Sequence, residues 1–193
     1  SMHQTLGSQR ARIAVIKHTR GSTSLHTDWF PGGDGTTSGD GPIYQEFQST
    51  VSSALASLAV LHPSAIIQVE GMIWHQGEND SSSDTNANAY QTNLSNFIND
   101  VRATYGGGLK FGIVRLSDNQ TSIDSARLAT VKQAQANVAA ASPLNYLVDT
   151  DDIPMSSPGN IHFGTPGVLT IGARLADGML RAPITDADGN GLD

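Results

Sequence analysis

The segment 71–80, GMIWHQGEND, is an apolar run that ends abruptly in polar side chains. Within six residues it holds an imidazole, an amide and a carboxylate, at His75, Gln76 and Glu78. A buried core has little use for such groups, because each buried polar atom needs a hydrogen-bond partner. Together these groups can move protons and donate hydrogen bonds to a reacting oxygen. The segment therefore predicts an active site at the end of a strand over 65–74.

Two other segments carry similar chemistry. The loop GNIHF (159–163) holds His162, and the loop RGSTSL (20–25) holds glycine and hydroxyl groups. Ester hydrolysis needs a nucleophile, a base that takes its proton, a group that orients the base, and donors for the oxyanion. An exposed His in a flexible loop fits the base. Ser22 and Ser24 are conceivable nucleophiles, although serine is also the ordinary residue of such loops.

Strand and helix patterns alternate along the chain. Apolar, β-branched runs predict strands over 12–18, 65–74, 109–117 and 144–150. Amphipathic spacing predicts a helix after Pro42, with Ile43, Phe47, Val51, Leu55 and Leu58 on one face. Further helices are predicted after an Asp84 cap, ending at 106–108, after a cap at Ser122 or Asp124, and over 166–180. This order predicts an α/β fold with a parallel sheet and helices on both faces.

The predicted topology places these groups together. In such a sheet, ligands bind beyond the carboxyl ends of the strands. The strand over 12–18 leads into the 20–25 loop, and the strand over 65–74 leads into His75 and Gln76. The strand over 144–150 leads towards His162. We therefore expect Gly21, Gln76 and His162 to lie at one edge of the sheet.

These segments resemble the conserved blocks of the SGNH hydrolases. WHQGEND (74–80) is similar to the W-x-Q-G-E-x-D motif of the acetylxylan esterase and sialate O-acetylesterase branch. NIHF, followed by IGARLA (171–176), is similar to the final block. RGSTSL looks like the Gly-Gly-Thr/Ser-Ser loop, with Ser22 in place of the second glycine. The resemblance spans about residues 11–181 and implies a three-layer flavodoxin-like fold.

The resemblance also implies residue roles. It makes His162 the general base of a serine esterase that deacetylates carbohydrates, without a cofactor or a metal. The family often has an Asp three residues before the base, but Gly159 stands there, so the orienting role falls to Glu78. The implied oxyanion and substrate-binding groups are Gly21, Ser22, Gln76, Gly77 and Asn79. Trp29, Phe30 and Trp74 are candidates for stacking on sugar rings, with core packing the stronger interpretation for Trp74.

One block of the family has no counterpart. SGNH hydrolases begin with a strand that ends in Gly-Gln-Ser-Asn or Gly-Asp-Ser and carries the nucleophile, and neither motif occurs in this sequence. LGSQ (6–9) holds a Gly-Ser pair but follows no apolar strand. We therefore expect one domain over 1–183 that lacks this strand, with a gap in the sheet. A missing N-terminal segment, or neighbouring domains of a longer chain, would be its partner. Residues 184–193 are expected to form an acidic linker or the start of a calcium-binding repeat.

The composition of the chain restricts the kinds of partner that it can bind. The 193 residues carry a formal net charge of −7, which disfavours nucleic acid and anionic membranes. No apolar run is long enough to span a membrane. The chain has no cysteine, which excludes disulfides and thiolate zinc sites. The scarcity of lysine beside abundant Ser, Thr, Asn and Asp favours a secreted bacterial protein. The family resemblance implies acetylated carbohydrate as its partner.

Alternatives to the esterase remain at this stage. A module that keeps the fold, lacks the serine and only binds carbohydrate fits the missing block. A phosphodiesterase-like or lipase-like SGNH enzyme is a further alternative. His18, His75 and His162 with Asp149 or Asp151 could converge on a metal, but no metal-binding spacing supports this. DADGNGLD (186–193) matches the first half of a calcium loop.

Overall fold

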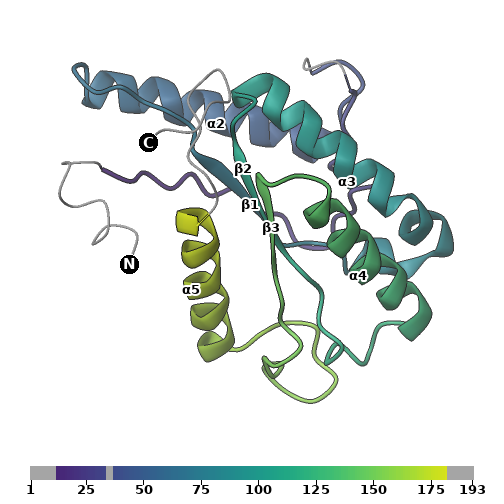
Figure 1. Cartoon of the computed structure of the whole chain (residues 1–193). Coiled ribbons are helices and arrows are strands. Elements are labelled where there is room, and N and C mark those ends of the chain that lie inside the picture. Colours follow the sequence, from purple (N-terminus) through teal and green to yellow (C-terminus); the bar gives the residue numbers. More distant parts are fainter. Residues whose placement is uncertain (1–11, 34–36, 182–193) are drawn as a thin grey trace.

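The computed structural model describes residues 12–33 and 37–181, and its centre is a parallel sheet of three strands (Figure 1). The strands lie in the order β1-β2-β3, with Gly71 opposite Lys110 and Phe111 opposite Asn145. Helices connect successive strands, as parallel pairing requires. Their bounds are β1 (Gly71–Trp74), β2 (Lys110–Val114) and β3 (Asn145–Val148).

The predicted helices are all present. They are α2 (Pro42–Leu61), α3 (Asp84–Tyr105), α4 (Ser125–Ala140) and α5 (Thr165–Arg181), with a short 3₁₀ helix η2 (Asp80–Ser82) after β1. Asp124 caps α4 by accepting from the backbone N–H groups of residues 126 and 127. The cap of α3 is Ser83, whose hydroxyl accepts from Asn86 N, so the cap predicted at Asp84 is one residue late.

The helices cover both faces of the sheet. Side chains alternate across a strand, so Phe111 and Ile113 of β2 pack with α3 and α4, whereas Val114 packs with Ile171 and Leu175 of α5. Figure 1 shows α5 on the opposite side of the sheet from α3 and α4. This is the predicted three-layer, flavodoxin-like α/β arrangement.

Two glycines allow α5 to approach the sheet closely. A Cβ at Gly112 of β2 would lie 2.3 Å from the Tyr146 hydroxyl, and one at Gly178 of α5 would lie 2.3 Å from the ring of Tyr146. Tyr146 of β3 thus fills the space that both positions leave open. Its hydroxyl donates to Leu175 O at 3.3 Å, which satisfies its polar atom within the layer.

The first predicted strand is not formed. Residues 12–18 have no helix or strand, and Val15 is 85% exposed. The strand predicted over 65–74 is likewise confined to Gly71–Trp74. A β-strand depends on a hydrogen-bonded neighbour, and β1 pairs only with β2 among residues 12–33 and 37–181. The edge of β1 that faces away from β2 has no strand partner among these residues, and the predicted gap would lie there. The apolar pattern of residues 12–18 was not sufficient to form a strand.

The predicted linker over 184–193, its calcium-like motif and the LGSQ segment lie outside the described residues. Among the helices that are described, none combines the length and apolar character needed to cross a membrane.

Candidate active site

The carboxyl end of β1 holds the 20–26 loop in place. Gln76 Nε2 donates to Thr23 O at 3.1 Å and to Asp80 Oδ2 at 2.5 Å. Asp80 also accepts from the backbone N–H groups of Leu25, at 2.8 Å, and His26, at 3.0 Å. Both N–H groups of the Gln76 amide are therefore occupied. Here Gln76 braces the loop, and its role as an oxyanion donor stays a prediction.

Asp80 is fully buried, which has an electrostatic consequence. Burial raises the pKa of its carboxyl above the ordinary Asp range, and the donors from Gln76, Leu25 and His26 oppose that shift. Asp80 is thus a structural carboxylate that ties residues 25 and 26 to the end of β1.

Gly77 must be glycine at its place in the site. Its φ of 149° lies in a region that L-residues avoid, and a Cβ would lie 3.1 Å from both Leu116 and Val131. Both the backbone angle and the lack of space therefore favour glycine between Gln76 and Glu78.

The 20–25 loop lies beside the segment that follows β1 and is hydrogen-bonded to it. Ser22 has a φ of 60°, the only positive value among the described non-glycine residues. Its carbonyl accepts from Asn79 Nδ2 at 3.3 Å. The backbone N–H groups of Gly21 and Ser22 have no hydrogen-bond acceptor in the described part of the chain. Ser24, by contrast, is buried, with its hydroxyl 2.7 Å from that of Thr27, which makes it part of a turn.

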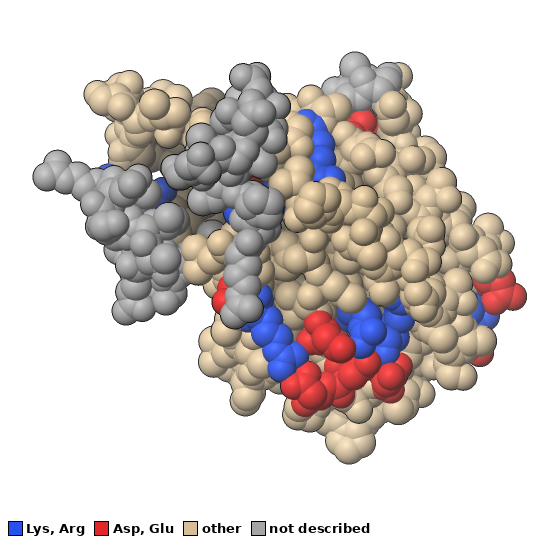
Figure 2. All heavy atoms as spheres, viewed as in Figure 1, with Lys and Arg blue, Asp and Glu red and all other residues tan. Residues whose placement is uncertain are grey.

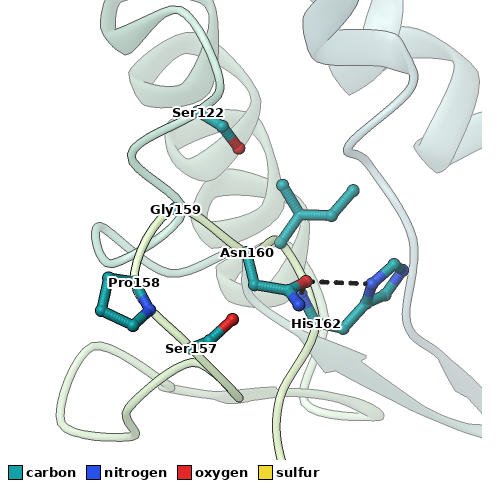
Figure 3. Close-up of a pocket in the computed structure, with 7 residues that line it drawn as sticks. Ser122, Ser157, Pro158, Gly159, Asn160 and His162 are labelled. Atoms are coloured by element: carbon teal, nitrogen blue, oxygen red, sulfur yellow. Dashed lines mark hydrogen bonds between the residues drawn. The ribbon is translucent and has the colours of Figure 1, made fainter.

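His162 is exposed on the loop between β3 and α5. Its backbone N–H donates to Asn160 Oδ1 at 2.9 Å, and its Nδ1 lies 3.2 Å from the same oxygen (Figure 3). Ser156 N donates to His162 O at 2.8 Å, and a bridge between Met155 and Phe163 closes the loop. A pocket of about 400 Å³ lies beside the imidazole and is lined by Ser122, Ser157, Pro158, Gly159, Asn160, Ile161 and His162.

Gln120, in the loop after β2, links Glu78 to the His162 loop. Gln120 Nε2 donates to Ile161 O at 2.8 Å and to Glu78 Oε1 at 3.3 Å. The structure thus brings the Gln-Gly-Glu segment and the His162 loop together. Whether Glu78 orients His162 directly stays a prediction, because the group at Nδ1 in the structure is Asn160.

His75 lies between these groups. Its ring centroid is 5.8 Å from that of Phe163. Although the residue keeps exposed surface, protein atoms crowd the imidazole and lower its pKa; the charge of Glu78 opposes this shift, and that of His162 adds to it. His75 is therefore a second imidazole of the site, and its surroundings disfavour the charged form.

Ion pairs fix the carboxyl ends of β2 and β3. Arg115 pairs with Asp149 at 2.7 Å and with Asp151 at 2.5 Å, and Lys132 of α4 also binds Asp151. Arg174 of α5 binds both carboxylate oxygens of Asp152. Figure 2 shows these acidic and basic side chains gathered along the lower edge of the molecule. The segment that leads from β3 to His162 is therefore anchored to β2, α4 and α5.

The metal alternative gains no support from these contacts. His18 binds Thr50 and packs against Trp29, and the carboxylates of Asp149 and Asp151 bind Arg115. Residues 12–33 and 37–181 contain no group of three or more His, Asp or Glu side chains arranged to hold a metal ion. Trp29 and Trp74 are 5% and 4% exposed and pack together in the core, so of the aromatic candidates only Phe30 is free to meet a sugar.

Sequence reasoning missed two residues of the site. Gln120 lies in an irregular polar loop and matches no motif. Asn160 is uncharged and lies two residues before His162, so it does not match the acidic residue that the family places three residues before the base. A signal for Asn160 existed: Asn and Asp side chains commonly bind the backbone N–H two residues ahead. A buried glutamine in a loop has no comparable signature.

Comparisons with known proteins were made for the chain. None of the curated proteins matches it. A solved protein from Arabidopsis thaliana aligns with a TM-score of 0.71 at 20% identity and covers 93% of this chain, which shows the shared fold. This chain spans 64% of that protein's length. A carbohydrate acetylesterase from Xanthomonas citri aligns with a TM-score of 0.47 at 25% identity, over 68% of this chain and 28% of its own.

A family model described as carbohydrate esterase, sialic acid-specific acetylesterase, matches residues 1–181. This match confirms the resemblance of WHQGEND and NIHF to the acetylesterase branch of the SGNH hydrolases. The chain belongs to this family of carbohydrate esterases.

Proposed function

We propose that the chain is the greater part of a serine O-acetylesterase that releases acetate from acetylated carbohydrate. The observation that carries the proposal is the contact from Gln120 to both Glu78 and Ile161 O. It joins the two family segments at one edge of the sheet, next to an exposed imidazole and an open pocket. Family membership supplies the reaction class.

His162 acts as the general base in this proposal. With a hydrogen on Nδ1 donated to Asn160, the lone pair of Nε2 is free to take the proton of a serine hydroxyl. The serine oxygen attacks the acetyl carbonyl, and protonated His162 then gives its proton to the departing sugar oxygen. Water repeats the sequence on the acyl-enzyme, which releases acetate and restores the serine.

The oxyanion would be held by the 20–25 loop and its neighbours. The backbone N–H groups of Gly21 and Ser22 are available as donors, and one N–H of Asn79 remains after its bond to Ser22 O. Backbone donors fixed in advance suit a developing negative charge, and losing one donor of this kind typically costs about 3 kcal/mol in the barrier. Gln76 and Gly77 support the role by fixing the backbone of this segment.

The serine nucleophile is assigned to a strand that pairs with the free edge of β1. Residues 12–18 and 66–69 belong to no strand of the sheet, and their apolar side chains include Ile13, 43% exposed, and Ile66, 90% exposed. Ile73 of β1 itself is 50% exposed. A further strand between these segments would pair their backbones and cover this apolar surface.

The test is turnover of p-nitrophenyl acetate and acetylated xylan by the purified 193-residue chain. We expect little or no hydrolysis, because a triad without its nucleophile retains only a small part of its activity. A chain extended by a strand ending in Gly-Gln-Ser-Asn should hydrolyse both substrates, and His162→Ala in that chain should abolish the gain. Robust activity of the 193-residue chain that is lost in His162→Ala would overturn the placement of the serine. Ser8, Ser22 and Ser24 would then be mutated.

A second candidate function is carbohydrate binding without catalysis, which the absence of the nucleophile motif from the sequence favours. Binding of acetylated xylan by the chain, together with inactivity of the extended chain, would support this module over the esterase.

A further inference from the structure

Gln120 is an unusual glutamine, because it lies in a loop and is nevertheless 0% exposed. Glutamine is mostly found at the surface, and a buried amide needs partners for two N–H donors and one oxygen. Gln120 has all of them. Its Oε1 accepts from Ser117 N at 3.0 Å, and its Nε2 donates to Ile161 O and Glu78 Oε1.

The amide joins three segments that are far apart in the sequence. Ser117 follows β2, Glu78 follows β1, and Ile161 immediately precedes His162. Both groups that meet Nε2 are acceptors, a carbonyl and a carboxylate. A donor is therefore required between them, and glutamate, the closest residue in shape, would place a second carboxylate there.

The loop that carries Gln120, residues 117–120, is held in place by contacts that do not involve the Gln120 side chain. Asn119 Nδ2 donates to Asp151 O at 2.9 Å and to Ile153 O at 3.1 Å, and Asp118 N donates to Asp151 Oδ1 at 2.9 Å. The 117–120 loop is therefore attached to the start of the 149–163 segment by other contacts. The Gln120 side chain carries that attachment onward to Ile161 and Glu78.

We propose that Gln120 is a positioning residue of the esterase, which holds Glu78 and the His162 loop at a fixed separation. The effect of Gln120 on catalysis rests on the proposed function, whereas its effect on the position of the His162 loop does not. It adds a residue from outside the family motifs, and it predicts that the imidazole loses its fixed position when the Gln120 amide is removed, even where the fold is kept.

The variants are chosen to separate positioning from stability. Gln120→Met keeps the length of the side chain and removes every polar atom. Gln135→Met is the matched control, since Gln135 is also 0% exposed and also binds backbone groups, Leu116 N at 2.9 Å and Gln76 O at 3.1 Å. The side chain of Gln135 binds neither Glu78 nor Ile161. Both variants should melt at a lower temperature than the unmodified chain.

The decisive readout is NMR of the 193-residue chain. In Gln120→Met we expect changed ring signals for His162, a changed carbonyl shift for Ile161, and greater backbone mobility over 157–163. In Gln135→Met these signals should match those of the unmodified chain. Unchanged His162 and Ile161 signals in folded Gln120→Met would overturn the proposal, as would equal changes in the two variants.

A second variant and a measurement on the unmodified chain cover the case in which Gln120→Met does not fold. In Gln120→Glu, protonation of the new carboxyl restores one donor, so the Ile161 shift should return towards its normal value as the pH falls. In the unmodified chain, the Nε2 protons of Gln120 should exchange with water at least about 100-fold more slowly than those of an exposed glutamine. Fast exchange would contradict the bridge.

Turnover in the extended, active chain completes the test. Gln120→Met should lower kcat about tenfold, with KM changed less than about twofold, because positioning acts on the reacting geometry and not on substrate affinity. If no form of the protein hydrolyses esters, the proposed function fails while the NMR result still decides the role of Gln120. If hydrolysis is present and kcat is unaffected, the positioning role is wrong and the proposed function stands.

Discussion

The side-chain oxygen of Asn160 accepts a hydrogen bond from the backbone N–H of His162 at 2.9 Å. The same oxygen lies 3.2 Å from Nδ1 of the His162 imidazole. A backbone N–H can only donate, so the atom it meets must be the oxygen of the amide and not its nitrogen. The oxygen in turn can only accept, which requires a hydrogen on Nδ1. Asn160 therefore selects the tautomer of His162 that leaves Nε2 free to act as a base.

The tautomer can be observed directly. At about pH 8.5, well above the ordinary pKa range of histidine, ¹⁵N spectra should show Nδ1 of His162 carrying the hydrogen and Nε2 without one. In Asn160→Ala the two ring nitrogens should move towards averaged shifts, because neither tautomer is then selected. A protonated Nε2 in the unmodified chain would contradict the assignment.

Glu78 and Asn160 should contribute unequally to turnover. In the extended, active chain we expect Glu78→Gln to lower kcat/KM by at least about 100-fold, since a carboxylate stabilises the imidazolium in the transition state. Asn160→Ala should cost no more than about tenfold, because it removes only a neutral hydrogen bond. Equal and small effects would mean that another carboxylate, such as Asp149 or Asp151, serves His162.

Asp80 should make the protein less stable as the pH rises. Its folded-state pKa is raised by burial, so the folded protein holds this proton more tightly than the unfolded chain. Its contribution is greatest below the ordinary Asp range, about pH 4, and declines as the pH rises through the folded-state value. The free energy of unfolding of the unmodified chain, minus that of Asp80→Asn, should therefore be larger at pH 4 than at pH 7. A difference that grows with pH would show that the three donors outweigh burial.

Ser22→Gly should stabilise the chain slightly. The left-handed backbone at Ser22, with φ of 60°, costs an L-residue about 1–2 kcal/mol. Glycine relieves that cost but loses about 0.4–1 kcal/mol through the greater freedom of the unfolded chain. The net gain of about 0.5 kcal/mol is measurable by urea unfolding. Ser22→Ala, which keeps the Cβ, is the control and should give no gain.

Lys132 should determine part of the loss of folding stability at acid pH. Partial burial works against ionisation of Asp151, but the hydrogen bonds from Lys132 and the Asp118 amide, together with the charges of Arg115 and Lys132, hold the pKa of Asp151 below its ordinary range. The stability that Asp151 provides is therefore present above about pH 4 and is lost as the pH falls through the folded-state value. Lys132→Met should give a shallower loss of unfolding free energy between pH 4 and pH 2. An unchanged slope would show that Arg115 and the Asp118 amide sustain the effect without Lys132.

The layers of the fold were predictable because apolar periodicity and caps are local properties. Pro42 at the start of α2 and Asp124 at the cap of α4 act on their own segments, and both predictions are confirmed. The strand over 12–18 was wrong for the opposite reason: pairing is a property of two segments, and an apolar run such as 13–16 cannot indicate whether its neighbour is present.

In the candidate site, too, local features were predictable and contacts between distant segments were not. His162 and Glu78 could be predicted as site residues because a family motif fixes their place in the sequence. Their relation to each other could not, because it passes through Gln120, whose partners lie 42 and 41 residues away. Tertiary contacts of this kind leave no local pattern. The departure at Ser22 was visible in the sequence, but its cost became clear only from the backbone angle.

The parallel register of the sheet has a consequence for how the protein folds. Gly71 pairs with Lys110, and Phe111 pairs with Asn145, so a complete helix separates each strand from its neighbour along the chain. Such non-local pairing closes long loops and slows folding. The helices can begin to form locally, whereas the edge that holds His162, Glu78 and Gln120 arises only when all three strands have assembled. Refolding monitored at the His162 ring should therefore lag behind the recovery of helical circular dichroism, and the site should be among the last parts of the molecule to acquire its native geometry.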